Sequence, residues 1–308
     1  MKRAPIVGIA GVGLIGASIG LRATACGWRA IGWDPDLEHA RLARERGAVG
    51  EVSPTFSALA ARAETLVLAA PLDATIGLLD ALVAEPPGAT LIIDVASVKT
   101  PIARAGATLP AFVPTHPIAG SERSGPGAAS ADLFAGRTWT YDPAAPPDAV
   151  GRARAFIVAM GATPYPLASI EHDRIVALTS HLPQLVSVAL GRRLGPELAD
   201  PNVVALCGTG VRSMLRLGAS SWPIWRAIVA ANSVALAQEV RTLANVLSMV
   251  ADALDGDRSD VLASDFATSA GAVACLGANA SESGSVTAAT TPTDERQTWI
   301  DGSHSAPL

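Results

Sequence analysis

The glycine pattern GVGLIG at residues 11–16 constrains the fold of this chain more than any other feature. It follows a short apolar run at residues 5–10, and the spacing GxGxxG between a strand and a helix is typical of a dinucleotide-binding turn. The first glycine permits the tight turn, the second lets backbone N–H groups approach a pyrophosphate, and the third lets helix and strand pack closely. The predicted cofactor-binding residues here are Gly11, Gly13, Leu14, Ile15 and Gly16.

The next apolar run, residues 28–33, ends at Asp34, about twenty residues beyond the glycines. At that place a carboxylate binds the ribose hydroxyls of a dinucleotide and repels a 2′-phosphate. Asp34 therefore predicts NAD rather than NADP as the cofactor. A turn or capping role before Pro35 is compatible with the same position, and the sequence leaves that alternative open.

Strand-like and helix-like segments continue to alternate through the first half of the chain. The predicted segments are a strand at 65–70, a helix at about 74–84, and strands at 90–94 and 112–114. Such alternation is typical of an α/β fold with a doubly wound (Rossmann) parallel sheet. Ligands of this fold bind beyond the carboxyl ends of the strands, where Pro71, Ser97 and His116 all lie. Pro71 and Ser97 are expected to line the cofactor.

His116 is the candidate catalytic residue. It lies in a predicted loop, residues 115–125, that is rich in Gly, Pro and Ser. Histidine is the side chain best suited to move a proton near neutral pH, and small neighbours let substrate and cofactor approach its ring. Ser97 either orients this imidazole or contacts the substrate, or else caps the following helix. A structural turn histidine is the alternative for His116.

The pattern changes from alternating to purely helical in the second half of the chain. Two last strands are predicted at 138–141 and 162–166, so the dinucleotide-binding domain is expected to span residues 1–168. Residues 169–256 predict an all-helical domain whose Ala, Leu and Val faces form a dimer. Residues 257–308 are rich in Ala, Ser, Thr and Gly and are expected to be a flexible tail.

Composition narrows the classes of function. A length of 308 residues exceeds one ordinary core, which agrees with two domains. The net charge is -5 and the 23 Lys and Arg are scattered, so nucleic-acid binding is disfavoured. Cys26, Cys207 and Cys275 lack metal-ligand spacing, which argues against disulfides and metal sites and favours a reducing cytoplasm. No apolar run is long enough to span a membrane.

Longer motifs carry a family resemblance. They are the glycine segment 11–20, DVASVK at 94–99, THPIAGSERSG at 115–125, LFAG at 133–136, HD at 172–173, SHLP at 180–183 and GTGVRSMLRL at 208–217. With these motifs the chain resembles the TyrA family, the prephenate and arogenate dehydrogenases of tyrosine biosynthesis. The resemblance implies a Rossmann domain with a helical dimerisation domain, a homodimer, NAD as cofactor, and oxidative decarboxylation of prephenate, arogenate or both.

The resemblance also implies roles for individual residues. His116 is expected to accept the proton of the C4 hydroxyl, with Ser97 as its partner. Arg216 is expected to bind a substrate carboxylate through its bidentate guanidinium. Glu122 and Asp173 are expected to form an ionic network around Arg216.

Three further residues are candidates for binding the substrate. His172 and His181 are nine residues apart, so on one regular helix they lie half a turn out of phase. Both can face one pocket only if the segment bends or two elements contribute, and the resemblance favours His181. Gln184 stands where many family members have a histidine that contacts the substrate side chain. An amide can donate to the ketone of prephenate or accept from the ammonium of arogenate, so Gln184 does not decide between them.

Two other functions stay open. A different dehydrogenase with a Rossmann domain and a helical domain would need a lysine or aspartate base in the helical domain, and it would leave the 115–125 segment without a role. A non-catalytic NAD-binding regulator would need none of Ser97, His116 and Arg216.

Overall fold

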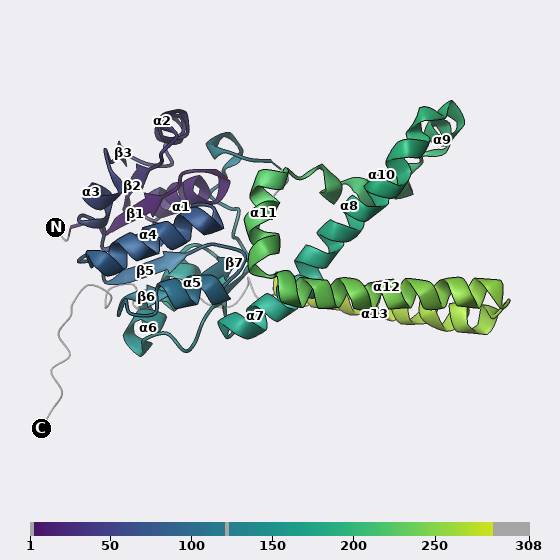
Figure 1. The fold of residues 1–308 in the computed structure, drawn as a ribbon. Coiled ribbons are helices and arrows are strands. Elements are labelled where there is room, and N and C mark those ends of the chain that lie inside the picture. The colour runs from purple at the N-terminus through teal and green to yellow at the C-terminus, as the bar shows by residue number, and fades with distance from the viewer. Residues whose placement is uncertain (1–2, 121–122, 286–308) are drawn as a thin grey trace, which may run out of the picture. The chain divides into compact units, whose positions relative to one another are not determined.

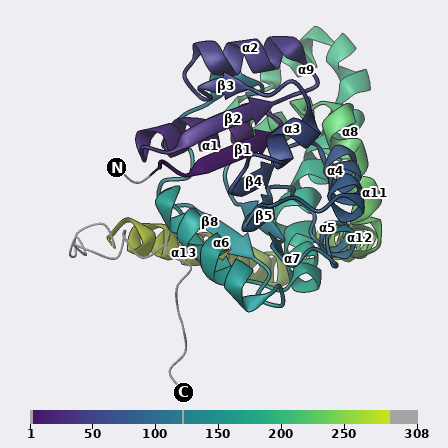
Figure 2. The same ribbon diagram turned by 90° about the vertical axis from the view of Figure 1, so that its left-hand side faces the viewer.

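A computed structural model describes residues 3–120 and 123–285 of the chain. The chain forms two compact units, Met1–Leu247 and Ser248–Leu308. The first unit contains a sheet of six strands, β1 (Ile6–Ala10), β2 (Arg29–Trp33), β3 (Glu51–Val52), β4 (Thr65–Leu68), β5 (Leu91–Asp94) and β6 (Phe112–Val113). All are parallel, in the order β3-β2-β1-β4-β5-β6, and Figure 2 shows the first five following one another. This is the doubly wound sheet that the sequence predicts.

Helices cover both faces of this sheet, as can be followed in Figure 1. One face carries α1 (Leu14–Ala25), α2 (Leu37–Glu45) and α6 (Pro147–Ala159), and the other carries α3 (Phe56–Ala60), α4 (Leu72–Ala84) and α5 (Thr100–Ala105). Side chains of β1 alternate between the two cores: Val7 and Ile9 join one, and Ile6 and Ala10 join the other. Burial on both faces explains why the central strands are continuous apolar runs rather than alternating ones.

A second sheet holds His116. It consists of β7 (Thr115–Pro117), β8 (Thr138–Tyr141) and β9 (Thr163–Pro166). β7 runs antiparallel to β8, with His116 opposite Thr140, whereas β9 runs parallel to β8. The prediction of a loop over residues 115–125 is therefore wrong for residues 115–117. Their backbone pairs with β8, more than twenty positions away in the sequence. His116 is thus held on a paired strand, which fixes its backbone.

The described chain beyond the second sheet is helical. Its helices are α7 (Ser169–Val176), α8 (Leu182–Leu194), α9 (Pro201–Leu206), α10 (Thr209–Leu215), α11 (Trp222–Ala231) and α12 (Ser233–Asp255). A π-helical turn, η2 (Ala177–His181), joins α7 to α8, and a 3₁₀ turn, η4 (Leu217–Ala219), follows α10 and packs on α8. A π-turn advances less per residue than an α-helix, so it changes which face the following residues occupy.

The expected flexible tail is wrong for residues 259–285, which form α13 (Ser259–Ser285) in the second unit. This segment contains no proline, and its apolar residues Leu262, Phe266, Val273 and Leu276 recur at three-, four- and seven-residue spacings. Such spacing places them along one helix face, a signal that the high Ala and Ser content obscured. Residues 286–308 lie outside the described residues.

Candidate active site

The glycine turn after β1 is fixed in shape and open above its second glycine. Gly11 has φ +92°, and a Cβ there would lie 2.5 Å from the Ala69 carbonyl oxygen. A Cβ at Gly16 would lie 1.9 Å from the Gly11 carbonyl oxygen, whereas no described atom lies within 4 Å of the position of a Cβ at Gly13. Gly13 directly precedes α1. This space beside the backbone donors at the start of α1 fits a pyrophosphate.

Asp34 lies beside this turn at the end of β2. Its Oδ2 accepts a hydrogen bond from the backbone N–H of Val12 at 2.9 Å, and its Oδ1 accepts one from the backbone N–H of Asp36 at 2.9 Å. The turn role that the sequence left open is therefore present. A carboxylate has about four lone-pair sites, so Asp34 can still accept a ribose hydroxyl. Pro71 follows β4 at the same edge and directly precedes α4.

His116 lies at this carboxyl edge, half-buried, and contacts a second histidine. Its Nδ1 is 2.9 Å from Nε2 of His172, and the two rings meet edge to face. Burial holds the pKa of His116 well below its ordinary value, and the nearby His172, Lys99 and His181 lower it further by smaller amounts. The imidazole is therefore neutral near neutral pH and has a ring nitrogen able to accept a proton.

His172 and Asp173 follow one another on α7, and both are buried. Nδ1 of His172 is 2.9 Å from Oδ1 of Asp173. The Asp173 carboxylate also accepts the backbone N–H groups of Lys99 (2.6 Å) and Thr100 (2.7 Å), where α5 begins. Burial raises the pKa of Asp173, but the hydrogen bonds from His172, Thr100 and Lys99 outweigh it and keep that pKa below its ordinary value. Asp173 is therefore ionised.

A buried ion pair supports the strand that carries His116. The side chains of Lys99 and Asp94 are paired, with exposed fractions of 3% and 0%. The Nζ of Lys99 also donates to the Thr115 carbonyl oxygen at 2.7 Å, and the Thr115 N–H donates to Oδ1 of Asp94 at 2.9 Å. Trp139 of β8 donates its Nε1–H to Oγ1 of Thr115 at 3.0 Å. Thr115, the residue before His116, is thus fixed by hydrogen bonds to three different side chains.

The π-turn η2 brings His181 to the same region as His172. Nδ2 of Asn232 lies 2.7 Å from the Asp173 carbonyl oxygen and 3.3 Å from Nδ1 of His181. Burial lowers the pKa of His181 to about 4, so the ring is neutral, and its Nε2 is buried without a hydrogen-bond partner among the described residues. His172 and His181, nine residues apart, can face one pocket only if the segment between them bends. In the structure this bend is a change from α-helix to π-helix at η2.

Other predicted site residues are placed differently. Ser97 is half-buried, and it does not cap α5, because the backbone N–H groups at the start of α5 donate to Asp173. Arg216, directly after α10, is exposed and makes no ion pair with a described residue. Within the described residues Asp173 makes no ion pair with Arg216, because its oxygens are used by α5 and His172. Glu122 lies outside the described residues.

Gln184 is buried on α8 and contacts the segment that follows Arg216. Its Nε2 donates to the Leu217 carbonyl oxygen at 2.7 Å, and Oγ of Ser187, one turn further on, accepts the Gly218 N–H at 2.7 Å. These two polar side chains fasten η4 to α8. The amide of Gln184 therefore positions backbone in this structure.

Lys99, Asp94, Thr115 and Asn232 received no role from the sequence. A signal existed for the first two, since DVASVK at 94–99 places an acid and a lysine next to a buried strand. Charged residues are almost never fully buried unless paired, so a pair could have been inferred. The role of Asn232 had no such signal, because its partners are more than fifty residues away.

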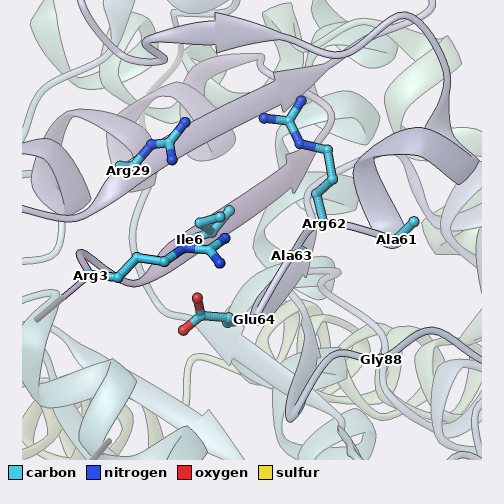
Figure 3. Close-up of a pocket in the computed structure, with 8 residues that line it drawn as sticks. All are labelled: Arg3, Ile6, Arg29, Ala61, Arg62, Ala63, Glu64 and Gly88. Atoms are coloured by element: carbon cyan, nitrogen blue, oxygen red, sulfur yellow. The ribbon is translucent and has the colours of Figure 1, made fainter.

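The cavity drawn in Figure 3 lies elsewhere. It has a volume of about 410 Å³ and is lined by Arg3, Ile6, Arg29, Arg62 and Glu64 among others. Ile6 and Arg29 begin β1 and β2, so this cavity is at the amino ends of the strands. Ligands of doubly wound sheets bind at the opposite, carboxyl edge. This cavity therefore lies away from the edge of the sheet that carries His116.

Within residues 3–120 and 123–285, no group of three or more His, Cys, Asp or Glu side chains is placed to hold a metal ion. In the same part of the chain, no helix is both long enough and apolar enough to cross a membrane.

Comparison with known proteins shows similarity over most of the chain. Residues 18–164 match the nucleotide-binding domain of prephenate dehydrogenase, and residues 168–268 match its dimerization domain. A probable prephenate dehydrogenase of Streptomyces niveus is 34% identical over 264 residues, which are 82% of this chain and 70% of that protein. The chain belongs to the prephenate dehydrogenase family.

Other members of the prephenate dehydrogenase family are similar over most of the chain. The Bacillus subtilis prephenate dehydrogenase is 31% identical over 73% of this chain and 63% of its own length. The crystal structure of Synechocystis arogenate dehydrogenase superposes with a TM-score of 0.74 at 25% identity, covering 88% of this chain and 99% of that one. Prephenate dehydrogenase from A. aeolicus in complex with hydroxyphenyl propionate and NAD+ shares the fold, with a TM-score of 0.76, 21% identity, and coverage of 84% and 93%.

Asp34 offers a test of cofactor selection in this family member. We expect Asp34→Ser to lower the preference for NAD over NADP by about tenfold, because it removes the charge that repels a 2′-phosphate. The measurement is binding of NAD and NADP to the purified variant. Asp36→Ser is the matched control, since it removes a neighbouring acid while serine can still cap α2. A preference that stays the same in Asp34→Ser would show that another group selects the cofactor.

Proposed function

We propose that this chain catalyses the NAD-dependent oxidative decarboxylation of prephenate, arogenate or both, a step of tyrosine biosynthesis. The observation that carries the proposal is His116: a neutral, half-buried histidine that lies, like the predicted cofactor turn, at the carboxyl edge of the sheet. Membership of the prephenate dehydrogenase family supports the same reaction.

The reaction needs three groups from the protein. The substrate carries a hydroxyl and a hydrogen on C4 and a carboxylate on C1 of a cyclohexadiene ring. Loss of a hydride from C4 and of CO₂ from C1 together make the ring aromatic. NAD, held by the glycine turn and Asp34, supplies the hydride acceptor. The chain must orient the ring, accept the proton of the C4 hydroxyl, and bind the carboxylates.

His116 accepts the proton from the C4 hydroxyl. Its low pKa keeps the ring unprotonated at neutral pH, so it is ready to accept a hydrogen bond before the reaction begins. Ser97 follows β5 and does not cap α5, so its side chain is available to contact the C4 hydroxyl. The ring of His181 is buried and neutral, and its Nε2 has no hydrogen-bond partner among the described residues. We infer that this ring contacts the side chain of the substrate.

Arg216 binds a substrate carboxylate. We expect Arg216→Leu to raise KM for the substrate by roughly 10- to 100-fold, because a hydrogen-bonded charge pair contributes about 1.5–3 kcal/mol. NAD affinity should stay the same. Arg212→Leu is the matched control: Arg212 is an exposed arginine on α10, one turn before Arg216, and its loss should change KM less than about twofold. Equal KM values for wild type and Arg216→Leu would remove Arg216 from the binding site.

The active enzyme is proposed to be a homodimer in a reducing cytoplasm. The match of residues 168–268 to a dimerization domain supports the assembly. Exposed apolar side chains on α12, including Val246, Leu247 and Met249, are suited to an interface. Cys26 and Cys207 carry free thiols, which suits a reducing compartment.

The function is tested by offering prephenate and arogenate separately, each with NAD and with NADP, and following the absorbance of the reduced cofactor. Turnover of either substrate with NAD is expected, and the pair of rates assigns the substrate. Folded protein that binds NAD but turns over neither substrate would instead favour another dehydrogenase or a non-catalytic regulator.

A further inference from the structure

Three side chains from two separate elements lie in a line of hydrogen bonds. Nδ1 of His116 on β7 is 2.9 Å from Nε2 of His172, and Nδ1 of His172 is 2.9 Å from Oδ1 of Asp173 on α7. His172 is 1% exposed, so water cannot replace either contact. The positions of the protons in this line follow from which atoms can donate.

Asp173 sets the first proton. An ionised carboxylate only accepts hydrogen bonds, so Nδ1 of His172 must carry a hydrogen and donate it. An imidazole that holds its single hydrogen on Nδ1 has a lone pair on Nε2, so Nε2 of His172 accepts. Among the described residues, its hydrogen-bond partner is Nδ1 of His116, which must therefore carry a hydrogen as well. This leaves Nε2 of His116 unprotonated.

The Asp173 carboxylate is itself held in place. Its Oδ1 accepts the Lys99 N–H and its Oδ2 accepts the Thr100 N–H, both from the start of α5. The backbone carbonyl of Asp173 accepts Nδ2 of Asn232 at 2.7 Å. The charged and titratable groups that face the line of histidines are Lys99, which is paired with Asp94, and neutral His181. Asp173 therefore has one orientation, and so does the ring that it binds.

We propose that Asp173 and His172 are positioning residues that hold His116 in the Nδ1–H tautomer, so that Nε2 is the atom that accepts the substrate proton. Neither residue touches the substrate. The inference rests on the proposed role of His116 as the base. Without the acceptor on His172, the ring of His116 is free to place its hydrogen on Nε2, where it would block proton acceptance.

The direct test is nitrogen NMR of the histidine rings in the full-length wild-type protein, with the His116 signals assigned by their absence from His116→Asn. We expect a protonated Nδ1 and an unprotonated Nε2 on His116 at neutral pH. The opposite tautomer in the wild-type protein would overturn the proposal, whatever the activity of the enzyme.

Two substitutions of His172 then separate positioning from structure. His172→Phe fills the space without an acceptor, whereas the side-chain oxygen of His172→Gln can still accept from Nδ1 of His116. We expect kcat to fall roughly 10- to 100-fold in His172→Phe, with the His116 tautomer shifted, and to recover to within a few-fold of wild type in His172→Gln. An unshifted tautomer in His172→Phe, or equal losses of kcat in two folded variants, would contradict the proposal.

The outcomes also distinguish this inference from the function on which it rests. If wild-type protein turns over neither prephenate nor arogenate, the proposed function fails, while the NMR result on the tautomer stands or falls separately. If turnover occurs but the tautomer is Nε2–H, the function survives and the positioning pair does not.

Discussion

Replacing His116 by Asn should lower kcat by at least about 10²-fold, because an amide cannot take up the proton of the C4 hydroxyl. Asparagine is smaller and polar, so it can keep a hydrogen bond to His172 without serving as a base. NAD affinity should stay nearly the same, since the glycine turn and Asp34 lie on other strands. The measurement is steady-state kinetics on prephenate and arogenate together with NAD titration of both proteins. Unchanged kcat would remove His116 from catalysis.

The pH profile of the wild-type enzyme provides an independent check on His116. A base must be unprotonated to work, and burial together with His172 keeps the pKa of His116 well below its ordinary value of 6.5. We therefore expect kcat/KM to stay level from neutral pH down through 6.5 and to fall only at lower pH. A fall centred at or above the ordinary value would show that the ring is not held neutral in the way the structure indicates.

Replacing Lys99 by Met should lower the free energy of unfolding by about 3–5 kcal/mol, because it leaves the charge of Asp94 buried without a partner. Asp94 has no exposed surface, and Lys99 also donates to the Thr115 carbonyl oxygen. Both contacts support the start of β7. Burial lowers the pKa of Lys99, whereas the charge and the hydrogen bond of Asp94 act to raise it. Asp94 thus favours the charged form of this buried ammonium.

Denaturant unfolding of three variants isolates the effect of the buried pair. The control Arg41→Met removes an exposed pair with Glu38 and Glu45 and should cost less than about 1 kcal/mol. The double variant Asp94→Asn with Lys99→Met removes both charges and should recover part of the loss. If Lys99→Met lowers the free energy of unfolding no more than Arg41→Met does, the loss of Lys99 does not leave Asp94 as a buried charge without a partner, and the prediction is contradicted.

The sheet and its ligand edge could be predicted because their signals are local. A strand buried on both faces is a continuous apolar run, and the glycine turn must directly follow β1, so both are visible within a few residues. The parallel order then places His116 at the same edge as Asp34 and Ser97 without any knowledge of side-chain contacts. The fold class predicted from the sequence is confirmed for this reason.

The contacts within the site could not be predicted, because they join distant residues. Asp173 pairs with the start of α5, more than seventy positions away, and not with Arg216 as the family resemblance implied. The nine-residue spacing of His172 and His181 called for a bend if both face one pocket, but it did not indicate that the bend is the π-turn η2. The placement of His116 on a strand likewise depends on β8, and the helix α13 was hidden by a composition that resembles a linker.

The most direct measurement uses substrate labelled in its ring carboxylate, with wild-type enzyme and NAD. The reaction assigned here predicts that, with prephenate, arogenate or both, one labelled CO₂ is released for each NADH formed, together with one 4-hydroxyphenylpyruvate or one tyrosine. NADH formed without labelled CO₂ would indicate a different dehydrogenation. Labelled CO₂ released without NADH, or no reaction of either substrate, would contradict an oxidative decarboxylase.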